Sequence, residues 1–108
     1  MIINKTHHPI TIFLPDGSQK EFLPELPAAR IQTIANPKIG EADGIEIVKT
    51  IYGDVENLPE PAQETWYIVP ALVSLALPDR ADLIRPDTGP DCLRDKNGKI
   101  LAVKRFTQ

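Results

Sequence analysis

The residues best suited to bind a ligand lie between Arg80 and Asp95. This stretch combines spaced arginines, among them Arg85 and Arg94, with the small-residue turn Asp87-Thr88-Gly89-Pro90. A guanidinium presents a planar fork that suits phosphate, and backbone amides around Gly89 together with the Thr88 hydroxyl would complete a cradle for an anion. These residue types therefore predict a binding site for a phosphate-bearing molecule.

A second interpretation of the same stretch is a salt-bridged loop. Arginines interleaved with aspartates often form surface ion-pair networks, and nothing like a P-loop or a dinucleotide fingerprint is present. Trp66 and Tyr67, on the preceding strand, offer aromatic faces on which a base could stack, but a tryptophan more often belongs to the core. The residues alone leave both interpretations open.

No residue pattern indicates catalysis or a metal site. His7 and His8 are adjacent, so on an extended chain they point to opposite faces and cannot easily share one metal ion. We expect them to face solvent before the turn at Pro9. Cys92 has no recognisable base and is expected to be a small, half-buried apolar residue. We expect a protein that is not an enzyme and needs no cofactor.

The charge of the chain is distributed unevenly. The net charge of −3 argues against general affinity for DNA. Up to Asp79 there are five Lys/Arg against eleven Asp/Glu, whereas from Arg80 onward there are seven against four. The C-terminal segment is thus basic, and an anionic partner is expected to bind there.

The length of 108 residues and the 42% apolar content suit one domain, residues 1–108. A domain this small is only modestly stable, so a homo-oligomer is the default expectation. A single cysteine excludes a disulfide framework, and no apolar run approaches the roughly 20 residues that span a membrane. Without a signal-peptide pattern in residues 1–5, we expect a cytoplasmic protein that does not bind membranes.

Eleven prolines divide the chain into short pieces and largely exclude long helices. Residues 10–14 and 20–23 flank Asp16-Gly17 and predict a β-hairpin, and residues 93–95 and 99–106 flank Asn97-Gly98 and predict a second one at the C-terminal end. Strands are also expected over residues 29–35 and 45–52, with loop composition at Gly40 to Gly44.

The strongest strand signal is Thr65 to Val69, which we expect to be central in its sheet. Pro70 then begins a helix of about two turns that continues to Leu77 and should be mostly buried, because only Ser74 is polar. Residues 80–85 lead into the Arg85 to Pro90 loop. The predicted fold class is α+β, mainly antiparallel β-hairpins with one short helix following a central strand and a C-terminal β-hairpin.

Four stretches together resemble a known family: residues 4–10 (N-K-T-x-H-x-I), residues 52–61 (Y-G-D-V-E-N-L-P-E-P), residues 67–73 (Y-I-V-P-A-L-V) and residues 85–98 (R-P-D-T-G-P-D-C-L-R-D-K-N-G). The chain is similar to small phage-encoded proteins of the first Thoeris anti-defence type. The resemblance covers most of the chain.

The resemblance implies a non-enzymatic sponge that sequesters a cyclic ADP-ribose isomer in the infected host cell. Such proteins are oligomeric, and some also hold a second ligand, a cyclic oligonucleotide. It implies phosphate contacts from Arg85, Thr88, Gly89 and Arg94, and a base or ribose contact from Tyr67, with Lys104 and Arg105 as weaker additions.

A different class of function remains as the alternative. The chain would then be a small phage structural or protein-interaction module without a nucleotide ligand, whose acidic first part and proline-rich loops dock onto another protein. In that interpretation Arg85 and Arg94 would form ion pairs within the fold.

Overall fold

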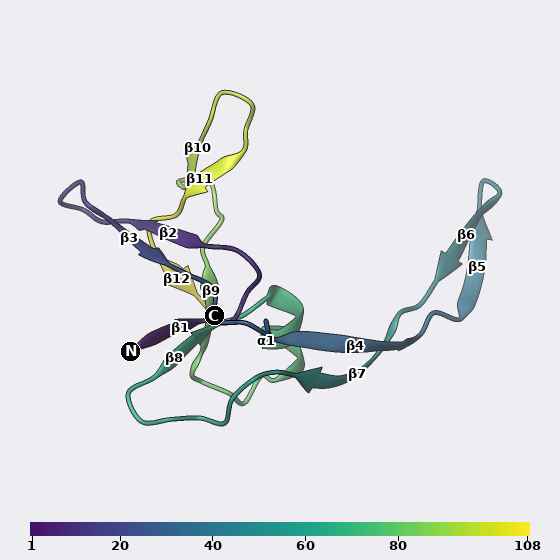
Figure 1. Ribbon diagram of the computed structural model, residues 1–108. Helices are drawn as coiled ribbons and strands as arrows, with labels where there is room; N and C mark the ends of the chain where they lie inside the picture. The colour runs from purple at the N-terminus through teal and green to yellow at the C-terminus, as the bar shows by residue number, and fades with distance from the viewer.

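Three parallel strands form the centre of the protein in the computed structural model, which describes all residues 1–108 (Figure 1). Strands β1 (Ile2–Asn4), β8 (Trp66–Ile68) and β9 (Leu83–Pro86) run parallel, and β12 (Phe106–Thr107) joins β9 antiparallel. The order is β1-β8-β9-β12. Strand β8 thus lies inside the sheet, which confirms the central position predicted for residues 65–69.

The two hairpins predicted from Gly-containing turns are present. Strands β2 (Ile10–Phe13) and β3 (Gln19–Phe22) pair antiparallel, and so do β10 (Leu93–Arg94) and β11 (Ile100–Ala102). Gly17 and Gly98 adopt φ of +88° and +84° in their turns, a conformation that glycine reaches without a steric penalty. With one short helix and several antiparallel hairpins, the fold is α+β, as predicted.

The C-terminal part differs from the prediction in two places. Residues 80–85 do not simply lead into a loop, because β9 begins at Leu83. The single strand predicted over residues 99–106 is wrong: β11 ends at Ala102 and β12 begins at Phe106. The two strands have different partners, β10 and β9, so the chain must turn between them.

A long arm, residues 30–56, extends from the rest of the molecule, which we call the body (Figure 1). Its proximal ribbon pairs β4 (Arg30–Ala35) with β7 (Ile51–Glu56), and its distal hairpin pairs β5 (Lys38–Ala42) with β6 (Ile45–Val48). The single strand predicted over residues 45–52 is therefore wrong. Lys49 N–H donates to the Pro37 carbonyl at 2.9 Å where the two ribbons meet, so pairing changes partners there.

The loop predicted over residues 40–44 is also largely strand. Gly40 pairs with Ile47 within the β5–β6 hairpin. The chain reverses only at Asp43 and Gly44, whose φ values are +52° and +77°. Strand pairing within the arm has overridden the weak strand propensity of glycine.

Helix α1 (Ala71–Ala76) begins directly after Pro70, as predicted. The expectation that it is mostly buried is wrong, since only Val73 is buried, whereas Leu72 is 47% exposed and Leu75 is 67% exposed. A helix lying on the surface of a sheet buries one stripe of side chains. The sequence of α1 is apolar all round, so its outer leucines face solvent.

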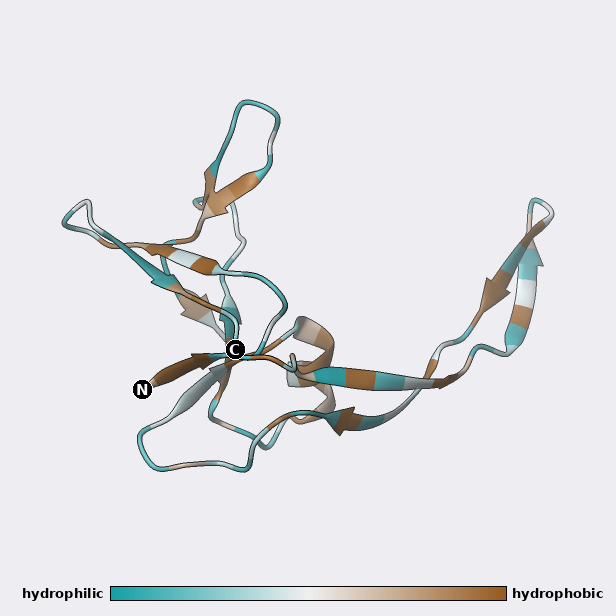
Figure 2. Ribbon diagram, viewed as in Figure 1, coloured by the Kyte–Doolittle hydropathy of each residue, from teal (hydrophilic) through white to brown (hydrophobic).

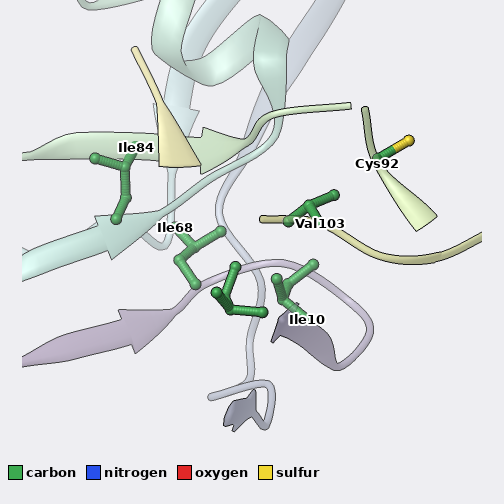
Figure 3. Packing of buried hydrophobic residues seen from close by; sticks show 6 residues of the cluster. Ile10, Ile68, Ile84, Cys92 and Val103 are labelled. Atoms are coloured by element: carbon green, nitrogen blue, oxygen red, sulfur yellow. The ribbon is translucent and has the colours of Figure 1, made fainter. Parts of the chain in front are cut away.

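The core consists of two apolar clusters formed by alternate residues of β8 and β9. Ile68 and Ile84 belong to the first cluster, which continues through Ile10, Val103 and Cys92 (Figure 3). Tyr67 and Leu83 belong to the second, together with helix residue Val73. Because successive strand residues point to opposite faces, the clusters lie on opposite faces of the sheet. Cys92 packs in the first cluster, as expected of an apolar residue, but it is buried rather than half-buried as predicted.

The arm makes the molecule extended, with dimensions of 52 × 39 × 22 Å. The radius of gyration is 16.7 Å, whereas about 13 Å is typical of a compact domain of about 100 residues. Only 16 of 108 residues are buried, and all of them lie in the body. The one helix of the fold is too short to cross a membrane.

Candidate anion-binding groove

A groove of about 620 Å³ lies where the three parallel strands end. Most of its lining comes from residues 6–8 after β1, residues 69–71 after β8, and residues 85–89 at the end of β9, and Ile10 and Thr107 complete it. Parallel strands bring their carboxyl ends to one edge of a sheet, where α/β proteins commonly bind ligands. We call this hollow the Arg85 groove.

Asn4 holds the first of these three segments in place. Its side chain is buried, and its Nδ2 donates to the His8 carbonyl at 2.9 Å and to the Phe22 carbonyl at 2.8 Å. Its Oδ1 accepts from the Thr6 N–H at 2.9 Å and from the Thr6 hydroxyl at 2.6 Å. One amide thus shapes the turn from β1 to β2, and this turn presents His7 and His8 at the groove.

Arg85 is the only lysine or arginine that lines the Arg85 groove. Its Nε is buried without a hydrogen-bond partner, and its NH2 group makes one long contact, 3.4 Å, to the Gln108 carbonyl. No Asp or Glu side chain lies within 4.0 Å of it, in contrast to Arg30, Arg80 and Arg105. Arg85 also borders a smaller hollow of about 320 Å³ beside α1, together with Arg80. A guanidinium with unused donors is the feature that an anion site requires.

The carboxylate of Asp87 also lines the groove, but it is already engaged. It accepts from Arg105 at 3.0 Å and from the Gly89 N–H at 3.1 Å. Arg105 also pairs with Asp91 at 2.6 Å, and this hydrogen bond holds the pKa of Asp91 below its usual range. Asp87 therefore does not neutralise Arg85, and the Gly89 amide is occupied. Thr88 is exposed in the same loop and its hydroxyl forms no hydrogen bond within the protein.

The predicted site residues are thus divided by the fold. Arg85, Thr88 and Gly89 line the groove together, whereas Arg105 lies outside the lining and contacts it through its ion pair with Asp87. Lys104 is exposed and outside the lining. Arg94 also lies outside, because it donates to the Gly98 carbonyl at 2.8 Å within the C-terminal hairpin.

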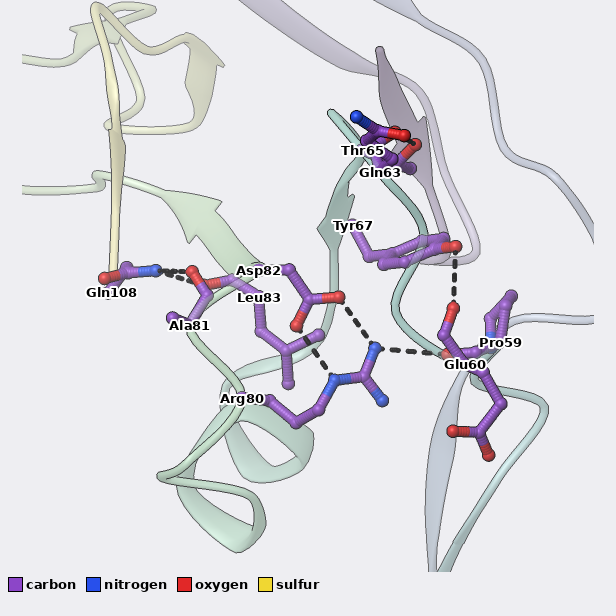
Figure 4. Close-up of polar contacts among 10 residues, drawn as sticks. All are labelled: Pro59, Glu60, Gln63, Thr65, Tyr67, Arg80, Ala81, Asp82, Leu83 and Gln108. Carbon is purple, nitrogen blue, oxygen red and sulfur yellow. Dashed lines mark hydrogen bonds and ion pairs between the residues drawn. The ribbon is translucent and has the colours of Figure 1, made fainter.

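Tyr67 lies in the core rather than at the groove. Its side chain belongs to the second apolar cluster, and its hydroxyl donates to the Glu60 carbonyl at 3.2 Å (Figure 4). The ring is only 3% exposed. A base or ribose contact from Tyr67 therefore has no path to a ligand in the Arg85 groove, and the planar side chains available there are those of His7 and His8.

Arg80 shows how a structural arginine is satisfied in the same segment. Its Nε and one NH2 group donate to the two oxygens of Asp82, each at 2.8 Å, and NH2 also reaches the Pro59 carbonyl at 3.1 Å (Figure 4). The hydrogen bond from Arg80 lowers the pKa of Asp82, and the same bond raises the pKa of Arg80. Arg80 and Arg105 thus fit the salt-bridge interpretation, whereas Arg85 does not.

Two groove residues, His7 and His8, were predicted to face solvent, and both are exposed. The sequence did not predict their position beside Arg85, because His7 and Arg85 are 78 positions apart along the chain. Only the pairing of β1, β8 and β9 brings the two segments together. A histidine pair directly after a short apolar strand was the available signal. No three metal-ligating side chains gather anywhere in the structure.

The groove therefore offers donors to an anion: the Arg85 guanidinium, the Thr88 hydroxyl and the histidine rings. Apolar surface from Val69, Pro70 and Pro86 completes it. Small-molecule sites commonly combine such apolar walls with a few polar groups. No family model, no curated protein and no solved structure matches this chain.

Proposed function

We propose that the Arg85 groove binds a phosphate-bearing small molecule and that the protein sequesters a cyclic ADP-ribose-type messenger without converting it. The observation that carries this proposal is Arg85 itself. It is a guanidinium with a buried, unpartnered Nε, at the carboxyl edge of a parallel sheet, with no Asp or Glu side chain within ion-pair distance. The terminal nitrogens of this guanidinium carry further donors that no Asp or Glu accepts, so a phosphate in the groove would take them.

The lack of an activated nucleophile supports binding over catalysis. The Thr6 hydroxyl donates to Asn4, and Cys92 lies in the core away from the groove. Nucleophilic catalysis needs a hydroxyl or thiol within hydrogen-bond reach of an oriented base. A sponge needs only affinity, which arginine, hydroxyl and histidine donors supply.

The choice of a cyclic nucleotide rests on the sequence resemblance to the anti-defence sponges. In that setting the protein would act in the cytoplasm of the infected cell, where a TIR-domain protein produces the messenger. The volume of the groove, about 620 Å³, falls within the usual range of small-ligand sites.

Capture followed by release tests the proposal. The purified protein is mixed with cyclic ADP-ribose isomers, free ligand is removed, and the complex is denatured by heat. We expect intact nucleotide to be recovered in stoichiometric amounts. Recovery of a cleaved product would refute sequestration, and no capture at all would refute the choice of ligand.

Two alanine variants locate the site. Arg85→Ala should weaken binding about 100-fold or more, because two charge-assisted hydrogen bonds contribute on the order of 3 kcal/mol or more. Arg94→Ala is the matched control, since Arg94 lies outside the groove, and its dissociation constant should stay within about threefold of the wild type. Equal losses in both variants would refute the assignment of the site.

A protein-interaction module remains the second candidate, and one observation favours it. The arm exposes large apolar side chains along most of its length, among them Ile34, Ile39 and Ile45. If the wild type captures no nucleotide, this alternative becomes the better account of the chain.

A further inference from the structure

The arm, residues 30–56, has no apolar core of its own. None of the 16 buried residues lies in it. Seven of its large side chains are between 42% and 68% exposed: Ile34, Ile39, Ile45, Ile47, Val48, Ile51 and Tyr52. Figure 2 shows brown, apolar segments along the strands of the arm, and the distal hairpin β5–β6 lies far from the body. Such a surface belongs to an element that is covered by something else.

The backbone of the arm is equally incomplete. Strands β4 and β7 pair only with each other, and so do β5 and β6. Every one of these strands therefore has a free edge, which in most proteins is covered or guarded. Isolated two-stranded hairpins are marginally stable in water, and three strands or packing against another element are needed for independent stability. The arm needs a covering partner whenever the chain is folded.

We propose that this partner is a second copy of the chain, and that each arm lies against the body of the other copy. The seven side chains expose on the order of 700 Å², close to the ~800 Å² per partner of a standard stable interface. The arm exposes these apolar side chains whenever the chain is folded, so its partner must be present at all times. Another copy is always present, and two-fold homodimers are the commonest soluble oligomers.

Charge favours the body over the other arm as the covering surface. The arm contains three Lys/Arg and five Asp/Glu and has a net charge of −2, whereas residues 80–108 have a net charge of +3. Two arms packed together would place like charges in contact, but an arm on the C-terminal segment brings opposite charges together. The body also exposes apolar side chains, including Leu72 and Leu75 on α1 and Leu101 on β11.

The mass in solution tests this proposal. Light scattering coupled to size-exclusion chromatography should give the wild type at least twice the chain mass of 12.0 kDa. The double variant Ile39→Asp and Ile45→Asp should fall to a single chain mass. Both side chains are more than 60% exposed within one copy, so the substitutions disturb no contact inside the body. A wild-type monomer at 100 µM would overturn the proposal and leave a different protein as the covering partner.

Leu23→Asp is the matched control, because Leu23 is equally exposed, at 66%, but lies outside the arm. This variant should keep the wild-type mass. Amide hydrogen exchange gives a second readout: arm amides should be protected in the wild type and lose protection in the double variant, while β8 amides stay protected in both. An assembly that survives the double variant would overturn the arm as its interface. The test is independent of the nucleotide, so its failure would leave the Arg85 groove unaffected.

Discussion

Replacing Arg85 and Arg80 by methionine, one at a time, separates a binding arginine from a structural one. Both residues lie in the same segment, and methionine keeps most of the side-chain length while removing the charge and the donors. Arg85 has a buried Nε with no acceptor, whereas Arg80 makes three hydrogen bonds to Asp82 and Pro59. The two variants should therefore change stability in different directions.

The magnitudes follow from these contacts. Arg80→Met leaves the Asp82 carboxylate, only 17% exposed, without its partner. Losing a charged hydrogen-bonded pair of this kind should cost about 2–3 kcal/mol, somewhat less than in a fully buried pair. Arg85→Met removes an unsatisfied donor and one 3.4 Å contact to Gln108. Its effect should lie between zero and a gain of about 2 kcal/mol.

Urea unfolding followed by far-ultraviolet circular dichroism measures both effects. The variants must be compared at equal protomer concentration, because the proposed self-association would add to stability. We expect the free energies of unfolding of the two variants to differ by at least 2 kcal/mol, with Arg85→Met the more stable. An Arg85→Met variant as unstable as Arg80→Met would refute the reasoning, because Arg85 would then have a structural partner.

Two further predictions concern the loss of stability at acid pH and the turn beside the groove. The hydrogen bond from Arg80 lowers the pKa of Asp82 in the folded chain. The resulting stabilisation is complete above the pKa of an aspartate in the unfolded chain, about 3.9, and is lost as the pH falls through the lower pKa of the folded chain. In Asp82→Asn, the urea midpoint should therefore fall less steeply than in the wild type between about pH 5 and 2. The same decrease in both proteins would contradict this prediction. Asn4→Ala should lower the free energy of unfolding by about 2–4 kcal/mol, measured by thermal or urea unfolding, because the His8 and Phe22 carbonyls and the Thr6 N–H lose their partner. A loss below about 1 kcal/mol would show that other contacts hold the turn.

The pairing of strands is the main feature of this fold that short stretches of sequence do not predict. Turn positions are local, since Gly17 and Gly98 need positive φ and Pro70 sets the start of a helix. Both hairpins and α1 were therefore predictable. The parallel pairing of β1 with β8 joins residues more than 60 positions apart. Nothing in Ile2–Asn4 by itself indicates which strand it pairs with.

The candidate site shows the same division. The sequence by itself determined that positive charge is concentrated from Arg80 onward, and that Arg85, Thr88 and Gly89 are close neighbours along the chain. Only the tertiary structure decided which arginine is free. Asp82 satisfies Arg80, Asp87 and Asp91 satisfy Arg105, and the C-terminal hairpin holds Arg94 away from the groove. The physical reason is that a guanidinium's availability depends on which acceptors the folded chain places around it. Some of these, such as Asp87 for Arg105 and the Pro59 carbonyl for Arg80, come from other segments of the chain.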